Sequence, residues 1–239
     1  MKKVAWISAG VSSFIASYLA SDVDIHIYID IDDQHEDSLR FIKDCEKVLG
    51  KEILILKSPY GCVENVIRAK KYINGVHGAP CTRELKRRIR LEWEQGQGEL
   101  TYVWGYDVNE KNRAKRMIES YPEYNHEFPL IDKGLTKEDA HGLLMQLGIK
   151  RPKMYDLGYS NNNCVGCVKG GMGYWNKIRK DFPEVFEKRA KLEREVGASC
   201  IRGTFLDELE ENKGNTYEIM PECSLLCELA MDEKNGNNS

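Results

Sequence analysis

The sequence lacks any long apolar run and any large excess of charge of one sign. No apolar stretch approaches the ~20 residues that a helix needs to cross a bilayer, so we expect no membrane-spanning segment. The 35 basic and 38 acidic residues leave a formal net charge of -3, so nucleic-acid binding would need a local patch. Because 41% of the 239 residues are hydrophobic, we expect a soluble globular protein rather than a disordered chain.

The sequence also lacks an internal repeat and a linker long enough to separate independent domains. Apolar, β-branched runs predict strands at 4–7, 24–30, 53–56 and 100–104. Helical spacing predicts helices at 14–20, 37–49, 82–94, 109–120 and, behind a capping-box pattern, from Thr136 to Gly148. Such alternation predicts a three-layer α/β/α fold around a mostly parallel sheet of about five strands.

The pattern changes near Arg151. Residues 158–173 are rich in asparagine, glycine and cysteine and predict a loop, whereas 182–196 predict a helix and 198–229 small irregular elements. We expect a main domain over 1–150, a cysteine-bearing segment over 151–231 and a disordered tail over 232–239.

The N-terminal segment has a superficial likeness to a secretory leader, with two lysines ahead of a mostly apolar stretch to Ala20. Four serines and Gly10 interrupt that stretch, and residues 4–7 favour a buried strand that enters a small-residue loop. We therefore expect a cytoplasmic protein.

The loop at residues 8–13 joins the first predicted strand to the first predicted helix. Ligands of open parallel sheets bind at the carboxyl ends of strands, and small side chains allow backbone N–H groups to approach phosphate. The alternative is a tight turn in which Ser12 or Ser13 caps the helix. The loop is neither a Walker A motif nor a GxGxxG motif.

This loop resembles the PP-loop, Ser-Gly-Gly-x-Asp-Ser, of the adenine nucleotide alpha hydrolase superfamily. Ser8, Gly10 and Ser13 match, whereas Ala9 replaces a glycine and Ser12 stands where the aspartate would be. That acid manages Mg²⁺ and pyrophosphate in members that cleave ATP, so its absence argues against ATP cleavage. The sulfonucleotide reductase branch tolerates the change, and Mg²⁺ is compatible with either branch.

Further segments, in the family's order, extend the resemblance to phosphoadenosine phosphosulfate (PAPS) reductase-like proteins over nearly the whole chain. The segment 81–86 is similar to the family's Cys-Thr-x-x-Leu-Lys, and 104–113 is similar to its Gly-x-x-x-x-x-Glu-x-x-Arg stretch. Residues 129–131, the helix after Thr136, and Tyr155 ahead of 163–167 complete the order, in a version that looks most like bacterial and phage members.

The resemblance implies that residues 1–150 bind an adenine nucleotide, ATP or PAPS. Asp30, at the end of the second predicted strand, is placed for a ribose or adenine contact. The nucleotide-binding residues we expect are Ser8, Ala9, Gly10, Ser12, Ser13, Asp30, Lys86, Gly105, Glu110 and Arg113.

Two closely spaced cysteine pairs stand out among the eight cysteines. Cys164 and Cys167 form a CxxC pair around Gly166, which allows a tight fold, and Cys223 and Cys227 form a CxxxC pair. Four thiolates suit a [4Fe–4S] cluster or a structural Zn²⁺, and the spacing does not choose between them. The alternatives are unrelated core thiols or, in a secreted protein, disulfides.

Two cysteines are candidate catalytic residues. Cys81 precedes a basic helix that contains Lys86, where a thiolate is favoured, although it also suits a small buried position. Cys223 resembles the cysteine of a family Glu-Cys-Gly-x-His tail that attacks the sulfonucleotide sulfur, so it is a ligand or a nucleophile. We expect the remaining cysteines to be structural: Cys45, Cys62 and Cys200. Tyr174 and Trp175 are expected to pack the metal loop down, or to stack on a base.

Three functions follow as hypotheses. The first is a sulfur-handling enzyme similar to PAPS reductase, with a thiol or redox donor protein as partner. The second is an ATP-dependent thiolation enzyme acting on tRNA or DNA, with the basic clusters at 86–90 and 113–116 on the nucleic-acid backbone rather than on a solvated face. The third is a nucleotide-binding module without catalysis. A homodimer is compatible with each.

Overall fold

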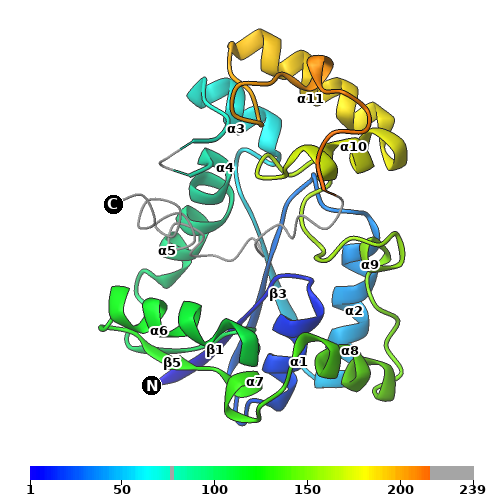
Figure 1. Cartoon of the computed structure of the whole chain (residues 1–239). Helices are drawn as coiled ribbons and strands as arrows, with labels where there is room; N and C mark the ends of the chain where they lie inside the picture. The colour runs from blue at the N-terminus through cyan, green and yellow to red at the C-terminus, as the bar shows by residue number, and fades with distance from the viewer. Residues whose placement is uncertain (76–77, 216–239) are drawn as a thin grey trace. The chain divides into compact units, whose positions relative to one another are not determined.

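The computed structural model describes residues 1–75 and 78–215, which divide into two compact units. Unit 1 comprises residues 1–30, 35–56 and 91–162, and unit 2 comprises 31–34, 57–90 and the described residues from 163 onward (Figure 1). Each unit uses chain from both sides of residue 150, and the domain boundary expected there stays a prediction. Cys223, Cys227 and the expected tail at 232–239 lie outside the described residues.

Unit 1 is built on a five-stranded parallel sheet with helices on its faces, which confirms the predicted fold class. The strands are β1 (Lys2–Ile7), β2 (Ile25–Asp30), β3 (Ile53–Lys57), β4 (Leu100–Val103) and β5 (Asn125–Glu127), in the order β3-β2-β1-β4-β5. Strand β5 was not predicted, because its Asn-His-Glu sequence carries no apolar pattern.

The central strand β1 pairs in parallel on both sides, with Val4 opposite Ile25 of β2 and opposite Tyr102 of β4. The chain therefore leaves β1 towards β2 in one direction and reaches β4 in the other. This reversal makes the carboxyl ends of β1 and β4 the topological switch point of the sheet, where ligands of such folds bind.

The helices of unit 1 include the four that the sequence predicted there and two short ones that it did not. They are α1 (Val11–Leu19), α2 (Asp37–Leu49), α6 (Lys111–Ser120) after a 3-10 turn at Val108–Glu110, α7 (Pro129–Asp132), α8 (Lys137–Gln146) and α9 (Lys153–Asp156). Helix α1 packs against α7 and α8 (Figure 1). The expected capping box opens α8, since Thr136 and Asp139 exchange side-chain and backbone hydrogen bonds.

Helix α1 begins three residues before the predicted start at residue 14, because Gly10 rather than a serine occupies the N-cap position. Gly10 is extended, with φ −94° and ψ 152°, and Ser12 and Ser13 lie in the first helical turn. The alternative in which either serine caps the helix is therefore wrong.

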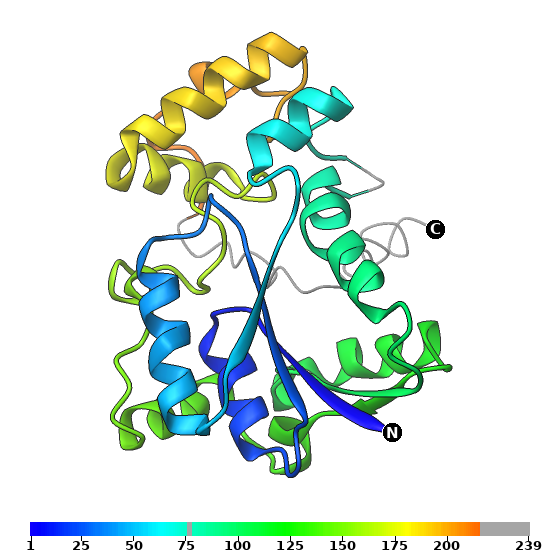
Figure 2. The ribbon, with the colours of Figure 1, turned by 180° about the vertical axis from the view of Figure 1, so that it is seen from behind.

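Unit 2 is mainly helical. It contains α3 (Val63–Lys70), α4 (Pro80–Thr82), a π-helical turn (Arg83–Arg87), the start of α5 (Arg88–Glu94), α10 (Met172–Asp181), α11 (Pro183–Val196) and a 3-10 turn at Leu206–Glu208. Helix α11 packs on α10 and α3 (Figure 2). The predicted helix at 82–94 is interrupted by the π turn, whereas the predicted helix at 182–196 is confirmed.

The apolar residues of β1, α1 and α2 form the core of unit 1. Phe14 and Phe41 meet edge to face with ring centroids 6.0 Å apart, and both are fully buried. Within residues 1–75 and 78–215, no helix combines the length and the apolar character needed to cross a membrane.

A buried histidine in this core makes the stability of unit 1 depend on pH. His26 is 3% exposed, its Nδ1 lies 2.8 Å from Ser17 Oγ, and burial together with the charge of Lys51 lowers its pKa from 6.5 to about 4. The native state therefore favours the neutral ring. The contribution of the neutral His26 ring to the free energy of unfolding is fully present above pH 6.5. It is lost as the pH falls through 4, which lowers the free energy of unfolding by about 3 kcal/mol.

The measurement is the free energy of unfolding in urea at several pH values across this window. We expect His26→Gln to lose most of the slope, while His126 and His141, whose pKa values burial also lowers, retain a smaller one. An unchanged slope in His26→Gln would show that His26 does not control the acid transition.

Candidate functional site

The loop between β1 and α1 is closed by its own hydroxyls. Ser13 Oγ accepts a hydrogen bond from the Ser8 N–H at 3.0 Å and donates to the Gly10 carbonyl at 2.9 Å. Ala9 adopts a left-handed conformation with φ +57°. Because Gly10 has no side chain, no N-cap side chain covers the first turn of α1, and the positive end of the helix dipole is left to other partners.

A second backbone segment approaches this loop at the switch point. Gly105 follows β4, and a Cβ built on it would lie 2.6 Å from Ser13 Cα and 2.7 Å from the Ser13 backbone nitrogen. Only glycine permits so close an approach of two backbones. The structure thus places Gly105 against the loop, as a shared site requires; its contact with a nucleotide stays a prediction.

The other expected nucleotide residues are divided between the units. Glu110 and Arg113 form an ion pair, and the Arg113 guanidinium carbon lies 4.7 Å from the centroid of the Tyr106 ring. Asp30 ends β2 and accepts a 3.4 Å hydrogen bond from the Tyr28 hydroxyl. Lys86 belongs to unit 2, whereas Asp30, Glu110 and Arg113 belong to unit 1 with the loop.

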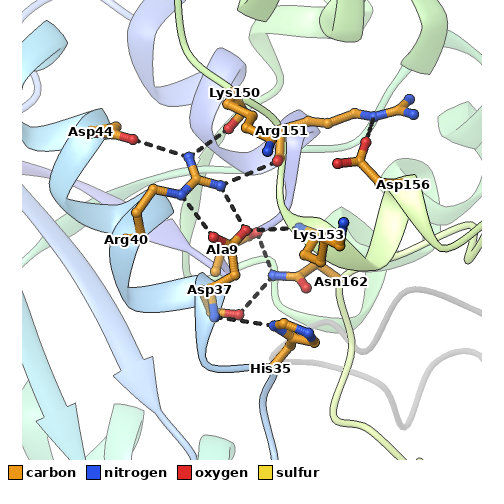
Figure 3. A network of polar contacts seen from close by, with 11 residues as sticks. Ala9, His35, Asp37, Arg40, Asp44, Lys150, Arg151, Lys153, Asp156 and Asn162 are labelled. Carbon is orange, nitrogen blue, oxygen red and sulfur yellow. Dashed lines mark hydrogen bonds and ion pairs between the residues drawn. The ribbon is translucent and has the colours of Figure 1, made fainter. Parts of the chain in front are cut away.

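A polar network in unit 1 ties the segment at 150–153 to helix α2 (Figure 3). The Arg40 guanidinium binds the Asp37 and Asp44 carboxylates and donates to the carbonyl oxygens of Lys150 and Arg151 at 2.8 and 3.2 Å. Asp37 in turn accepts from the Lys153 N–H at 2.8 Å. The hydrogen bond from Arg40 lowers the pKa of Asp37, so this carboxylate remains charged and the anchor persists at neutral pH.

Two side chains beyond this anchor reach the loop, and neither contact is predicted by the sequence. The Asn162 amide donates to the Ala9 carbonyl at 2.9 Å (Figure 3), and the Tyr155 hydroxyl accepts from the Val11 N–H at 3.4 Å. In the sequence, Tyr155 is marked only by its place in the series of segments that resemble PAPS reductase-like proteins, and Asn162 only as one of three consecutive asparagines. No local pattern marks either residue, because their partners lie 144 and 153 residues earlier in the chain.

Three cysteines of unit 2 line one cavity, which we call the thiol pocket. Cys81, Cys164 and Cys167 share its wall with Lys86 and Lys169. The remaining lining residues are Ile31, Val63, Thr82, Leu85 and Val168. The cavity of ≈ 20 Å³ admits one ion or one water-sized group. The sequence pattern pairs Cys164 with Cys167 and marks Cys81 as a candidate catalytic thiol, but it does not predict that the three share a cavity.

Thiols are suitable donors for zinc or an iron–sulfur cluster, so the donor types in the pocket fit the expected group. In the part of the chain that the structure describes, however, no three His, Cys, Asp or Glu residues are grouped so that they could hold a metal ion. The remaining expected ligands, Cys223 and Cys227, lie beyond it.

The CxxC loop is held by a tyrosine, as predicted. The Tyr174 hydroxyl accepts from the Cys167 N–H at 2.9 Å and donates to the Cys164 carbonyl at 3.3 Å. Burial raises the pKa of Tyr174 well above 10, so the phenol remains protonated and able to donate. Gly166 has φ +71°, and a Cβ there would meet Val185 at 2.6 Å, so the turn needs glycine.

Two of the cysteines expected to be structural are deeply buried. Burial raises the pKa values of the Cys45 and Cys200 thiols, which makes both poor nucleophiles. The third, Cys62, is the N-cap residue of α3 and does not line the thiol pocket.

Comparison with known proteins adds little about function. No family model matches the chain. The chain is similar to the uncharacterized protein MJ0066 of Methanocaldococcus jannaschii, 25% identical over an alignment of 197 residues that covers 74% of this chain and 37% of that protein. It therefore spans little more than a third of the length of this curated relative.

The approach of Gly105 to the loop predicts a large effect of one methyl group. In Gly105→Ala the added Cβ meets Ser13 backbone atoms, which must move, so we expect a loss of about 1–3 kcal/mol in the free energy of unfolding. Gly142→Ala, in α8, is the control: its Cβ meets nothing within 4 Å and a helix gains from alanine. Urea denaturation that ranks Gly105→Ala at or above wild type would contradict the close approach.

Tyr174→Phe tests the hold on the CxxC loop. The ring is kept, but the buried Cys167 N–H and the Cys164 carbonyl lose their partner, so we expect a loss of about 1–3 kcal/mol and faster reaction of these thiols with Ellman's reagent. Tyr18→Phe, at an exposed tyrosine, should change neither. Wild-type thiol reactivity in Tyr174→Phe would mean that the hydroxyl does not restrain the loop.

Proposed function

We propose that this protein is an enzyme that binds an adenine nucleotide and handles sulfur, similar to PAPS reductase. The observation that carries the proposal is the thiol pocket, in which the CxxC pair and the distant Cys81 line one cavity together with two lysines. Ammonium groups beside thiols suit an anionic sulfur group, since they offset its charge.

The loop at 8–13 supports the nucleotide half of the proposal. It lies at the switch point of a parallel sheet, carries only small residues, and leads into a helix whose N-cap is a glycine. Backbone N–H groups in such a position bind phosphate oxygens without a cationic side chain. Binding of this kind would need neither the lysine of a Walker A motif nor the aspartate of the PP-loop.

The proposed reaction is the reduction of a sulfonucleotide. The Cys81 thiolate attacks the sulfonate sulfur, the S–O bond to the nucleotide breaks, and the nucleotide leaves with that oxygen, which takes up a proton. An external dithiol then attacks the Cys81 sulfur of the S-sulfonate and displaces sulfite, and its second thiol releases Cys81 as the thiol. The dithiol thereby supplies two electrons and becomes a disulfide, while the transferred sulfur is reduced from the sulfate to the sulfite level.

Cys164 and Cys167, with Cys223 and Cys227, would hold the metal or the cluster. A bound zinc ion or [4Fe–4S] cluster would offset part of the negative charge of the thiolates and would hold the CxxC loop in place. The cavity admits a single ion without rearrangement, whereas a cluster requires its wall to move apart. Tyr174 and Gly166 orient the two thiols in either case.

Nucleotide binding is tested in the loop itself. Gly10→Val places a branched side chain where phosphate must approach, and with φ −94° the backbone tolerates it, so we expect the fold to be kept and nucleotide binding to be lost. Ser12→Ala is the matched control and should bind as wild type. Isothermal titration with ATP, AMP and PAPS is the measurement, and unchanged binding by Gly10→Val would show that the nucleotide site lies elsewhere.

The sulfur chemistry is tested separately. Protein purified without oxygen is analysed for iron, zinc and acid-labile sulfide, and assayed for sulfite release from PAPS with a dithiol. We expect Cys164→Ser to lose the metal and Cys81→Ser to lose sulfite release, whereas Cys45→Ala, which alters a thiol outside the pocket, should lose neither. Release of AMP and pyrophosphate from ATP without sulfite formation would instead support the thiolation enzyme.

A further inference from the structure

We propose that Asn162 is a positioning residue for the nucleotide loop, and that it holds Ala9 in a backbone conformation that glycine would adopt without help. The inference rests on the proposed function, because it takes the loop at 8–13 as the phosphate-binding element. It concerns the alanine that stands where the PP-loop has its second residue, a glycine.

Ala9 is an unusual residue in its conformation and its burial. The described chain has three non-glycine residues with positive φ: Ala9, Asp22 and Lys71. Asp22 and Lys71 are exposed, and Lys71 is the C-cap of α3, where a left-handed residue is common. Ala9 is fully buried and lies in the loop itself. An L-residue is disfavoured in this region, so surrounding contacts must hold it there.

Asn162 provides such a contact. Its side-chain nitrogen donates to the Ala9 carbonyl at 2.9 Å and to Ser38 Oγ at 3.0 Å, so both amide protons are used. The side chain is 5% exposed, and its Oδ1 is buried without a hydrogen-bond partner. A buried amide that leaves its own oxygen unsatisfied makes its net contribution through its two donated bonds.

The bond to the Ala9 carbonyl also sets the direction of a donor in the loop. In a trans peptide the C=O of one residue and the N–H of the next lie in the same plane and point in opposite directions. No peptide bond in the described chain is cis. By fixing the Ala9 carbonyl towards its own side chain, Asn162 therefore aims the Gly10 N–H away from itself. If the peptide plane between Ala9 and Gly10 were flipped, the Ala9 carbonyl oxygen would face the phosphate in place of the Gly10 N–H.

Asn162 can hold the Ala9 carbonyl in place because hydrogen bonds fix the chain that precedes it. The network around Arg40 ties residues 150–153 to α2 (Figure 3). Lys137 of α8 donates to the Ser160 carbonyl at 2.6 Å and also contacts the Asn161 side chain. Two bonded anchors thus precede Asn162, which limits the freedom of its backbone.

The test is a double-mutant cycle read out by ATP and PAPS binding. Asn162→Ala should weaken binding roughly tenfold, because Ala9 then leaves the left-handed region in a large fraction of molecules. Ala9→Gly alone is the reference for the combined variant, because glycine adopts the left-handed conformation without support. The combined variant should bind within about threefold of Ala9→Gly, so the tenfold effect of Asn162→Ala should disappear in the glycine background. Ser38→Ala, which removes only the other partner of Asn162, should bind as wild type.

A combined variant that binds no better than Asn162→Ala would overturn the inference, because a residue that merely fills the core would not be rescued by a glycine at position 9. Asn162→Leu, which keeps the side-chain volume, serves in place of Asn162→Ala if the latter does not fold. If wild type binds neither nucleotide, the proposed function fails, and amide hydrogen exchange of residues 8–13 decides the positioning role alone. There, Asn162→Ala should speed exchange and Ala9→Gly should restore protection, whereas unchanged exchange in Asn162→Ala would overturn it.

Discussion

The parallel pairing of β1 with both β2 and β4 is the constraint on which unit 1 depends. Because neighbours flank β1 on either side, the loops that leave β1 and β4 face each other at one edge of the sheet. The close approach of Gly105 to Ser13 follows from this pairing, and so does the position of the loop at 8–13. The strand order therefore determines where the loop lies, and the hydrogen bonds from Asn162 and Tyr155 act on a loop in that position.

The loop at 8–13 also makes contacts with residues that lie far away in the sequence. Ala9 has a left-handed backbone conformation and is buried in the core of unit 1. Its carbonyl accepts a hydrogen bond from Asn162, the last residue of that unit in the sequence. The anchoring network uses carboxylates whose charges are maintained by arginine, so its strength does not change near neutral pH. The loop itself consists of small uncharged residues, and the charged groups that anchor its surroundings come from other segments.

The thiol pocket depends on a different kind of assembly. Its CxxC loop is shaped locally by Gly166 and by the Tyr174 hydroxyl, whereas Cys81 arrives from the N-terminal end of an interrupted helix. The π-helical turn that follows Cys81 contains Leu85 and Lys86, both of which line the cavity. Insertion of a π turn changes which side chains face one side of a helix, and functional sites often use this property.

The sequence by itself determined the fold class, four of the five strands, helices such as α2 and α11, and the capping box at Thr136, because each depends on local periodicity or on groups a few residues apart. It also marked the CxxC loop and the small-residue loop. Only the tertiary structure decided that Cys81 lines one cavity with Cys164 and Cys167, and that Asn162 and Tyr155 reach the loop. These features depend on contacts between residues far apart in the chain, and spacing along a sequence carries no record of such distances.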